Sequence, residues 1–427
     1  MKNIKNTSDN FHRLRLRIKL LRKRLRKRLR KCAIFLIVRL QNFKKRSFKR
    51  VKGFLITIFA ISYSVAYLLH GIFRNQTKQQ QSLFRLGVIV PNDFRLEKPN
   101  FNGGTKDIQS TLEQLSEMGI SYELFHVSRT SSHALYTLLR EPSRFFSISH
   151  IIVSIPGASG LIIPYLKILG FSEITFRSHN AELLHRWDWI KSSKSVWIIL
   201  KSIKKMIFGF FSDFFVSLFA SNILSVSEKE IDIYWSVLFP WSRRKLKFFP
   251  GVSPSHIGNG HLFREHEGGR RTYATIVGGF EGGTVISRAD RHFINQGHKI
   301  KKYFNAMGFR LVSVGSSFNL DFCDINFGFV DNYLEILHNS EIVIVPTSNG
   351  WGFKTKIADA VTLHQSVIVT ETLYNRLGIW RQMVSPIRDW ADIPNLKVRT
   401  FSAEEYQSFL IKIMYLRRKI LLDLIQK

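Results

Sequence analysis

Two successive series of short apolar runs, separated by a segment rich in Gly, His and Ser, constrain the fold of this chain most strongly. In each series, runs typical of buried strands alternate with segments of helical periodicity. The first series begins with residues 83–90 and the second with residues 273–277. Because such alternation requires crossover connections, it predicts parallel sheets with helices on both faces. We therefore expect an α/β chain of two Rossmann-like doubly wound domains facing a cleft.

The segments between these series set the expected domain boundaries. With 427 residues, the chain is long enough for two domains and an extension. Within the two domains, we predict one helix at residues 294–307 and a long helix at residues 196–220 that is either buried or in contact with a membrane. The predicted parts are an N-terminal extension at residues 1–82, a first Rossmann-like domain at residues 83–252, a linker at residues 253–271, a second Rossmann-like domain at residues 272–400, and a C-terminal helix at residues 401–427 that packs back on the first domain.

Positive charge is concentrated at the N-terminus. The formal net charge is +33, and residues 1–52 contain 21 of the 64 Lys and Arg residues with one acidic residue, Asp9. Within residues 13–31, apolar side chains recur at helical spacing among the cations, as in helices that lie along an anionic bilayer. The alternative is an arm that binds RNA or DNA, but interleaved aromatic residues and a nucleic-acid module are missing. We therefore expect membrane lipids, and no nucleic acid, as partners of residues 13–73.

An apolar segment at residues 53–73 is long enough to span a bilayer. The positive-inside rule would then place the rest of the chain outside the cytoplasm. Three interpretations stay open: an interfacial or re-entrant segment, a buried helix, or a type II membrane protein of a secretory lumen. We favour the first, which predicts a membrane-associated protein on the cytoplasmic face of the bacterial inner membrane.

The sequence pattern around the cysteines and carboxylates does not favour a metal site. Cys32 and Cys323 are the two cysteines and lie far apart, which argues against a disulfide framework. The run Asp321-Phe322-Cys323-Asp324 is not a paired-carboxylate motif in a suitable strand context. We therefore expect metal-free chemistry.

The strongest local signal for a ligand is the run GWGFKTKIADA at residues 350–360, directly after an apolar strand-like segment. Its glycines allow a backbone to approach a ligand, and a helix that begins there directs free amides at an anion. The two lysines add positive charge, and the aspartate falls where a carboxylate can accept hydrogen bonds from ribose. The alternative is a glycine turn with solvated lysines. The candidate donor-binding residues are Gly278, Gly279, Gly350, Gly352, Lys354, Lys356 and Asp359.

A second candidate cluster, RSHNAE at residues 177–182, follows a predicted strand of the first domain. Its imidazole, amide and carboxylate groups suit contact with an acceptor or with a transferring sugar. The alternative is a capped helix start. The candidate catalytic residues are His179, Asn180 and Glu182, and the candidate acceptor-side residues are Gly103, Gly104 and Arg177.

The order of these segments resembles GT-B glycosyltransferases related to the large retaining family 4. The resemblance rests on GFVD at residues 328–331, the helical run after it, the strand ending at Pro346, the Gly-x-Gly-x-Lys-x-Lys run and a strand at residues 366–370. It implies that Lys356 contacts the donor diphosphate and Asp359 the ribose. The chain departs from the family where Asp359 replaces the usual Glu, and where Trp351 replaces a Glu that many members carry.

This resemblance implies a glycosyltransferase that moves a sugar from a nucleotide-sugar donor to a glycan or glycolipid acceptor, with retained anomeric configuration. The nucleotide sugar is then a substrate, and no cofactor is expected. A lipid-linked or polysaccharide acceptor would account for the basic extension. Two alternatives stay open: a nucleotide-sugar epimerase on the same fold, and a non-catalytic GT-B-like scaffold whose donor loop has decayed.

Overall fold

In a computed structural model of the chain, the described residues are 86–94, 103–128, 134, 138, 148–155, 159–169, 171–179, 181–192, 196–252, 271–278, 288–315, 319–330, 333–347 and 354–426. All of them belong to one compact unit, residues 80–427. The basic and apolar N-terminal segments and most of the predicted linker lie outside the described residues.

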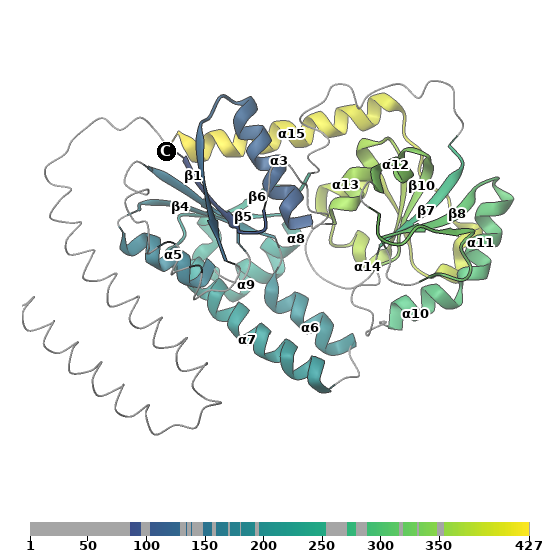
Figure 1. Ribbon diagram of the computed structural model, residues 1–427, viewed down its shortest axis with the longest axis horizontal. Coiled ribbons are helices and arrows are strands. Elements are labelled where there is room, and N and C mark those ends of the chain that lie inside the picture. Colours follow the sequence, from purple (N-terminus) through teal and green to yellow (C-terminus); the bar gives the residue numbers. More distant parts are fainter. Residues whose placement is uncertain are drawn as a thin grey trace, which may run out of the picture. The chain divides into compact units, whose positions relative to one another are not determined.

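The first sheet has six parallel strands in the order β2-β1-β3-β4-β5-β6 (Figure 1). Strand β3 pairs with β1 on the side opposite β2, so the strand order reverses between β1 and β3. The elements are β1 (Leu86–Pro91), α3 (Gly103–Glu117), β2 (Tyr122–Val127), β3 (His150–Val153), α5 (Ser159–Ile168), β4 (Glu173–Ser178), α6 (Glu182–Ser192), α7 (Val196–Phe219), β5 (Asn222–Ser225), α8 (Glu228–Glu230), the π-helix η3 (Ile231–Trp235), α9 (Ser236–Leu238), η4 (Pro240–Lys245) and β6 (Leu246–Phe248).

The second sheet also has six parallel strands, but in the order β12-β11-β10-β7-β8-β9, so that two strands, β8 and β9, lie beyond its first strand, where the first sheet has β2 alone. Here the order reverses between β7 and β10. The elements are β7 (Tyr273–Val277), α10 (Arg288–Asn295), α11 (Gly297–Ala306), β8 (Arg310–Val314), β9 (Ile325–Asn326), α12 (Tyr333–His338), β10 (Ser340–Val345), α13 (Thr355–Thr362), β11 (Ser366–Thr370), α14 (Glu371–Tyr374), η6 (Gly378–Met383), β12 (Val384–Ile387) and η7 (Trp390–Asn395).

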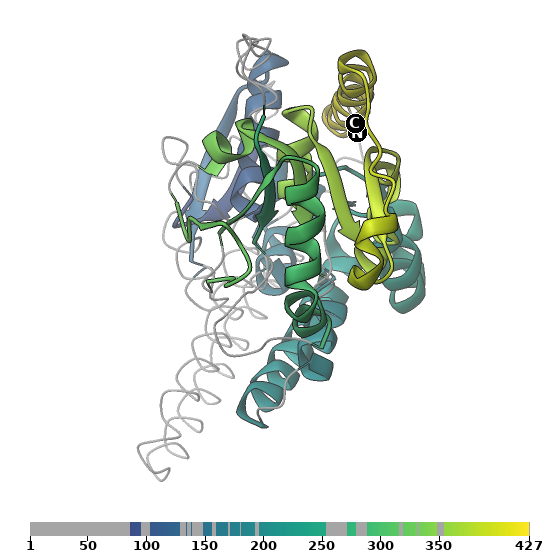
Figure 2. The ribbon, with the colours of Figure 1, turned by 90° about the vertical axis from the view of Figure 1, so that its right-hand side faces the viewer.

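Strand side chains alternate between two hydrophobic cores on the faces of the second sheet. Val343 and Val345 pack with α12 and α13 on one face, whereas Ile342 and Ile344 pack with α10 and α11 on the other. Figures 1 and 2 show these helices on opposite faces. Because successive residues of a strand point to opposite faces, a strand covered on both sides must be apolar throughout, as SEIVIV nearly is. The predicted fold of two Rossmann-like doubly wound sheets is confirmed.

The last helix, α15 (Ala403–Ile425), contributes to the cores of both sheets. Its N-terminal half places Phe409 and Ile413 in the core that contains α13. Its C-terminal half places Leu421 and Leu424 against the core of β1 and α3. The helix begins with a capping box in which Ser402 and Glu405 satisfy each other's backbone amides. It therefore joins the two sheets through apolar contacts.

Two helix boundaries differ from the sequence prediction. The helix expected at residues 294–307 is α11, which begins at Gly297, and the first two residues of the expected range belong to α10, which was not predicted and ends before Gln296. Gly297, the first residue of α11, packs so closely on Phe322 that a Cβ there would lie 2.1 Å from the ring. Gly103 and Gly104, expected to precede the first helix, form its first turn instead.

Helix α7 confirms the long helix predicted at residues 196–220 but not a buried position for it. Trp197 at its start is 82% exposed and Phe208 is 64% exposed. The alternative of contact with a membrane therefore stays a prediction. Among the described residues, no helix is both long enough and apolar enough to cross a bilayer.

Candidate functional site

The switch point of the second sheet brings two of the predicted donor-binding residues together. Gly278 directly follows β7, and Lys356 lies in the first turn of α13, which follows β10. The Lys356 Nζ atom donates to the Val277 carbonyl at 3.0 Å. Gly278 has a φ of +54°, and a Cβ on it would lie 2.6 Å from that Nζ. Ligands of doubly wound sheets bind at this place, outside the carboxyl ends of the strands.

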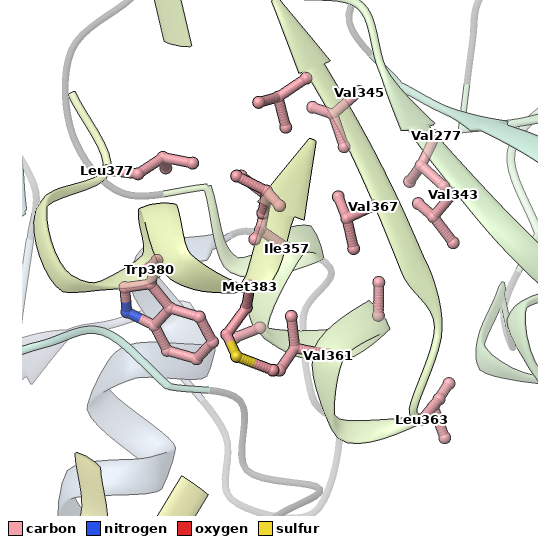
Figure 3. Close-up of a cluster of buried hydrophobic side chains, with 14 of the residues drawn as sticks. Val277, Val343, Val345, Ile357, Val361, Leu363, Val367, Leu377, Trp380 and Met383 are labelled. Atoms are coloured by element: carbon pink, nitrogen blue, oxygen red, sulfur yellow. The ribbon is translucent and has the colours of Figure 1, made fainter. Parts of the chain in front are cut away.

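Helix α13 is held rigidly at this position. Ile357 and Val361 are fully buried and pack against β10 and β11, as Figure 3 shows. The residue before the helix, Lys354, has an extended backbone and makes no side-chain cap. The first turn contains no acidic residue. The positive end of the helix dipole and the Lys356 ammonium therefore act in the same place, which suits an anion such as a diphosphate.

Asp359, the predicted ribose ligand, is fully buried and binds a lysine that the sequence analysis did not identify. Its Oδ2 atom accepts a hydrogen bond from Lys106 Nζ at 2.8 Å, and the same ammonium donates to the Tyr333 hydroxyl at 2.8 Å. The Oδ1 atom of Asp359 makes no hydrogen bond with any described residue. One carboxylate oxygen is thus oriented by Lys106, and the other retains its capacity to accept a hydrogen bond.

Lys106 lies on α3, three residues after Gly103. The ion pair therefore links α3, the helix after β1, to α13, the helix after β10. Its side chain is 8% exposed. The only sequence signal was its place in GGTKD, directly after a glycine pair. The partner lies 253 residues away, which sequence periodicity does not reveal.

We expect Lys106→Met to lower the free energy of unfolding by about 2 kcal/mol, because the buried Asp359 carboxylate loses a charge-assisted hydrogen bond. Urea titration measures the change. The double variant Lys106→Met/Asp359→Asn should recover part of the loss, with a coupling energy above about 1 kcal/mol. Additive effects of the two substitutions would contradict the pairing.

In the first sheet, the predicted catalytic residue His179 lies between a hydroxyl and a carboxylate. Ser154, which follows β3, places its Oγ atom 2.9 Å from His179 Nε2. On the other side of the ring, Asp107 Oδ2 lies 3.5 Å from Nδ1. The three side chains come from β3, β4 and α3 and meet at the carboxyl ends of the strands. A carboxylate beside one ring nitrogen favours the tautomer with its proton there and orients the imidazole.

Asp107 is ionised because cations surround it. Burial alone would raise the pKa of this carboxyl group, but Arg177, His179 and Arg417 outweigh burial and lower the pKa to about 2. Arg177 binds it through two hydrogen bonds, from Nε at 2.7 Å and from Nη2 at 2.8 Å. Arg417 of α15 is fully buried, and its Nη1 lies 3.5 Å from Asp107 Oδ1. Both guanidinium groups stack on the Phe249 ring.

Arg177 therefore lies inside the protein and not on a surface that an acceptor reaches. It is 2% exposed, and besides Asp107 it donates to the Phe249 carbonyl at 2.7 Å. The expectation that it faces the acceptor needs correction: Arg177 holds Asp107, which in turn lies against His179. The sequence placed Arg177 correctly at the end of a strand but did not reveal that its partner was a buried aspartate 70 residues earlier.

The remaining candidates are described in part or not at all. Lys354 is partly buried, and its charge contributes, after burial and Arg186, to lowering the pKa of His185 on α6 to about 3. Glu182 begins α6, but its side chain is outside the described set. Asn180, Gly279, Gly350 and Gly352 also lie outside the described residues, and their roles stay predictions. Among the described residues, no three His, Cys, Asp or Glu side chains are grouped as metal ligands.

Comparison with known proteins identifies the fold. No protein-family model and no curated protein sequence matches the chain. Among solved structures, α,α-trehalose 6-phosphate synthase from Burkholderia multivorans matches with a TM-score of 0.50 at 11% identity, over 81% of this chain and 98% of that chain. Anabaena HepE, in a complex with UDP, matches with a TM-score of 0.43 at 13% identity, over 81% and 98%. A UDP-GlcNAc 2-epimerase from Methanocaldococcus jannaschii matches with a TM-score of 0.39 at 10% identity, over 78% and 100%.

At these identities the comparison concerns the fold alone. The match to the trehalose 6-phosphate synthase covers 98% of that enzyme and 81% of this chain. The chain therefore has the two-domain GT-B fold that the order of its motifs predicted.

Proposed function

We propose that this chain is a glycosyltransferase that transfers a sugar from a nucleoside diphosphate sugar to an acceptor. The observation that carries the proposal is the position of Lys356, whose ammonium lies at the positive end of α13 and beside Gly278, at the switch point of the second sheet. On a GT-B fold, the fixed positive charge of Lys356 and the open backbone at Gly278, which has no side chain, together suit a donor diphosphate.

The proposed roles of the other residues follow from their geometry. Asp359 holds α13 against Lys106 of α3 and does not itself reach a ribose, because the residue is fully buried and its Oδ1 atom faces the interior. Lys356 and the α13 dipole stabilise the charge that develops on the leaving diphosphate, without a metal ion. His179, oriented by Asp107, contacts the transferring sugar or the acceptor. In the retaining mechanism that the family resemblance implies, the departing phosphate helps to deprotonate the acceptor.

The acceptor that we propose is a glycan or glycolipid at a membrane, with the enzyme on the cytoplasmic face of the bacterial inner membrane. Support comes from the basic and apolar composition of residues 13–73. A type II membrane protein of a secretory lumen is the alternative topology.

Incubation of the full chain with a panel of nucleoside diphosphate sugars tests the function. A glycosyltransferase slowly hydrolyses its own donor, and mass spectrometry then detects free sugar and nucleoside diphosphate. Conversion of the sugar while it stays attached to the nucleotide would instead indicate an epimerase. Nucleotide binding without turnover of any donor would indicate a scaffold and overturn the proposal.

We expect Lys356→Ala to weaken nucleoside diphosphate binding by at least about 1.5 kcal/mol, or roughly tenfold, the scale of one charge-assisted hydrogen bond. Isothermal titration calorimetry with UDP and GDP measures the change. Lys302→Ala is the matched control, since Lys302 is an exposed lysine on α11. Equal affinities of wild type and Lys356→Ala would remove Lys356 from the donor site.

A further inference from the structure

The long helix α7 buries the side that is more polar and exposes the side that is more apolar. Its buried side chains include three serines and an aspartate, whereas tryptophan and phenylalanine side chains face outward. A helix on the surface of a soluble domain normally has the opposite arrangement. The buried polar residues are Ser202, Ser212, Asp213 and Ser217.

Hydrogen bonds fix this orientation. The Gly160 amide of α5 donates to Ser212 Oγ at 2.9 Å, and a Cβ at Gly160 would lie 2.4 Å from the Ser212 backbone. The indole of Trp241 donates to Ser217 Oγ at 2.9 Å, and the hydroxyl of Tyr234 donates to Asp213. Rotation of α7 to hide its aromatic residues would leave these polar groups without partners, at a high cost. The apolar side is therefore fixed outward.

The outer face of α7 exposes apolar side chains in two stretches, residues 196–200 and 207–219, with exposed lysines between them. Trp197 is 82% exposed, Phe208 is 64% exposed and Phe211 is 54% exposed. Near its C-terminal end, Trp241 of η4 is 49% exposed and contacts the Phe214 ring. Figure 1 shows α6 beside α7. The outer face of α7 is defined here as Trp197, Leu200, Phe208, Phe211, Leu218 and Phe219, all of which are exposed.

Every exposed charged side chain on α7 is positive. They are Lys201, Lys204 and Lys205, and the one acidic residue of the helix, Asp213, is buried. Lys204 lies over the Phe208 ring, with Nζ 5.9 Å from its centroid. Arg243 and Arg244, exposed in η4, extend the cationic border. Aromatic side chains bordered by lysines match the interface of a bilayer, where rings insert at the headgroup level and cations meet anionic lipid.

We propose that the outer face of α7 docks along the surface of an anionic lipid bilayer. The helix lies in the plane of the membrane, because its inner side is packed on α5 and only one side can meet lipid. At 24 residues it is about 36 Å long. The positive charge selects anionic lipid over an uncharged or basic partner. This contact belongs to the first sheet's own fold, is separate from residues 13–73, and does not depend on sugar transfer.

A fluorophore on the outer face of α7 tests the proposal in the full chain. The variant Phe208→Cys, in a Cys32→Ser background, carries an environment-sensitive nitrobenzoxadiazole label. Cys323 should not react, since it is buried and burial raises the pKa of its thiol to about 12. The matched control is Tyr415→Cys on α15, where the native side chain is 67% exposed. Vesicles of phosphatidylcholine with phosphatidylglycerol are compared with vesicles of phosphatidylcholine alone.

The emission at position 208 should shift to the blue and intensify with the anionic vesicles, while the emission at position 415 stays unchanged. Substitution of Lys204 and Lys205 by Gln should raise the vesicle concentration at half-maximal shift by about fivefold per lysine. No shift at position 208 while the chain sediments with the vesicles would overturn the proposal. Shielding of the label without vesicles would also overturn it, because the face would then be covered by the chain's own N-terminal residues or a second copy. An equal shift on phosphatidylcholine alone would overturn the anionic assignment.

Discussion

Asp107→Asn is expected to lower the free energy of unfolding by about 3–5 kcal/mol, because it leaves two buried guanidinium groups without a countercharge. Arg177 is 2% exposed and Arg417 is fully buried, and both bind Asp107. Urea denaturation followed by circular dichroism measures the loss. Glu371→Gln is the matched control, since Glu371 is 54% exposed and should change stability by less than about 0.5 kcal/mol.

The pH dependence of this effect has a definite sign. The pKa of Asp107 is lowered from 3.8 to about 2, so its ion pairs stabilise the fold fully above pH 3.8 and cease to do so as the pH falls through about 2. The difference in stability between wild type and Asp107→Asn should therefore be constant near neutrality and shrink within that acid range. A difference that stays constant down to pH 2 would contradict the assigned role of the carboxylate.

His179→Ala is expected to reduce turnover of the donor that the panel identifies by about 10²–10³-fold, the usual cost of removing one positioned polar contact to the transition state. Nucleoside diphosphate affinity should be unchanged, because the ring lies with Ser154 and Asp107 at the first sheet and Lys356 lies at the second. Initial rates at saturating donor and calorimetry separate the two quantities. The control is His298→Ala, an exposed histidine on α11. Full activity in His179→Ala would exclude the ring from the chemistry.

The sequence predicted elements best where both ends carry a local signal. Strand β7 occupies the predicted residues 273–277, and α12 (Tyr333–His338) is the helical run predicted after residues 328–331, because the apolar run and the helical period there are interrupted on both sides. The close contact between Gly297 and Phe322 was not predictable, since these residues are distant in the sequence. Periodicity reports a local pattern and does not reveal which distant ring a glycine packs against.

Site residues that lie within a local sequence motif were predicted. Site residues whose role depends on a partner distant in the sequence were missed. Gly278 and Lys356 were identified from glycine and lysine patterns, and the structure brings them together. Lys106 and Asp107 were missed, because their partners lie 253 and 70 residues away. From the sequence alone, Lys106 and Asp107 are indistinguishable from ordinary charged residues in the first turns of a helix. Arg177 was identified, but its burial was not, for the same reason.

Helix α15 has a consequence for synthesis of the chain. The core of β1 and α3 contains Leu421 and Leu424, and Arg417 neutralises Asp107 within that same half of the molecule. During translation, the ribosome must therefore complete the half that contains the second sheet before the half that contains the first sheet can close its interior. The nascent first half should stay incompletely folded, with an exposed hydrophobic surface, until α15 emerges.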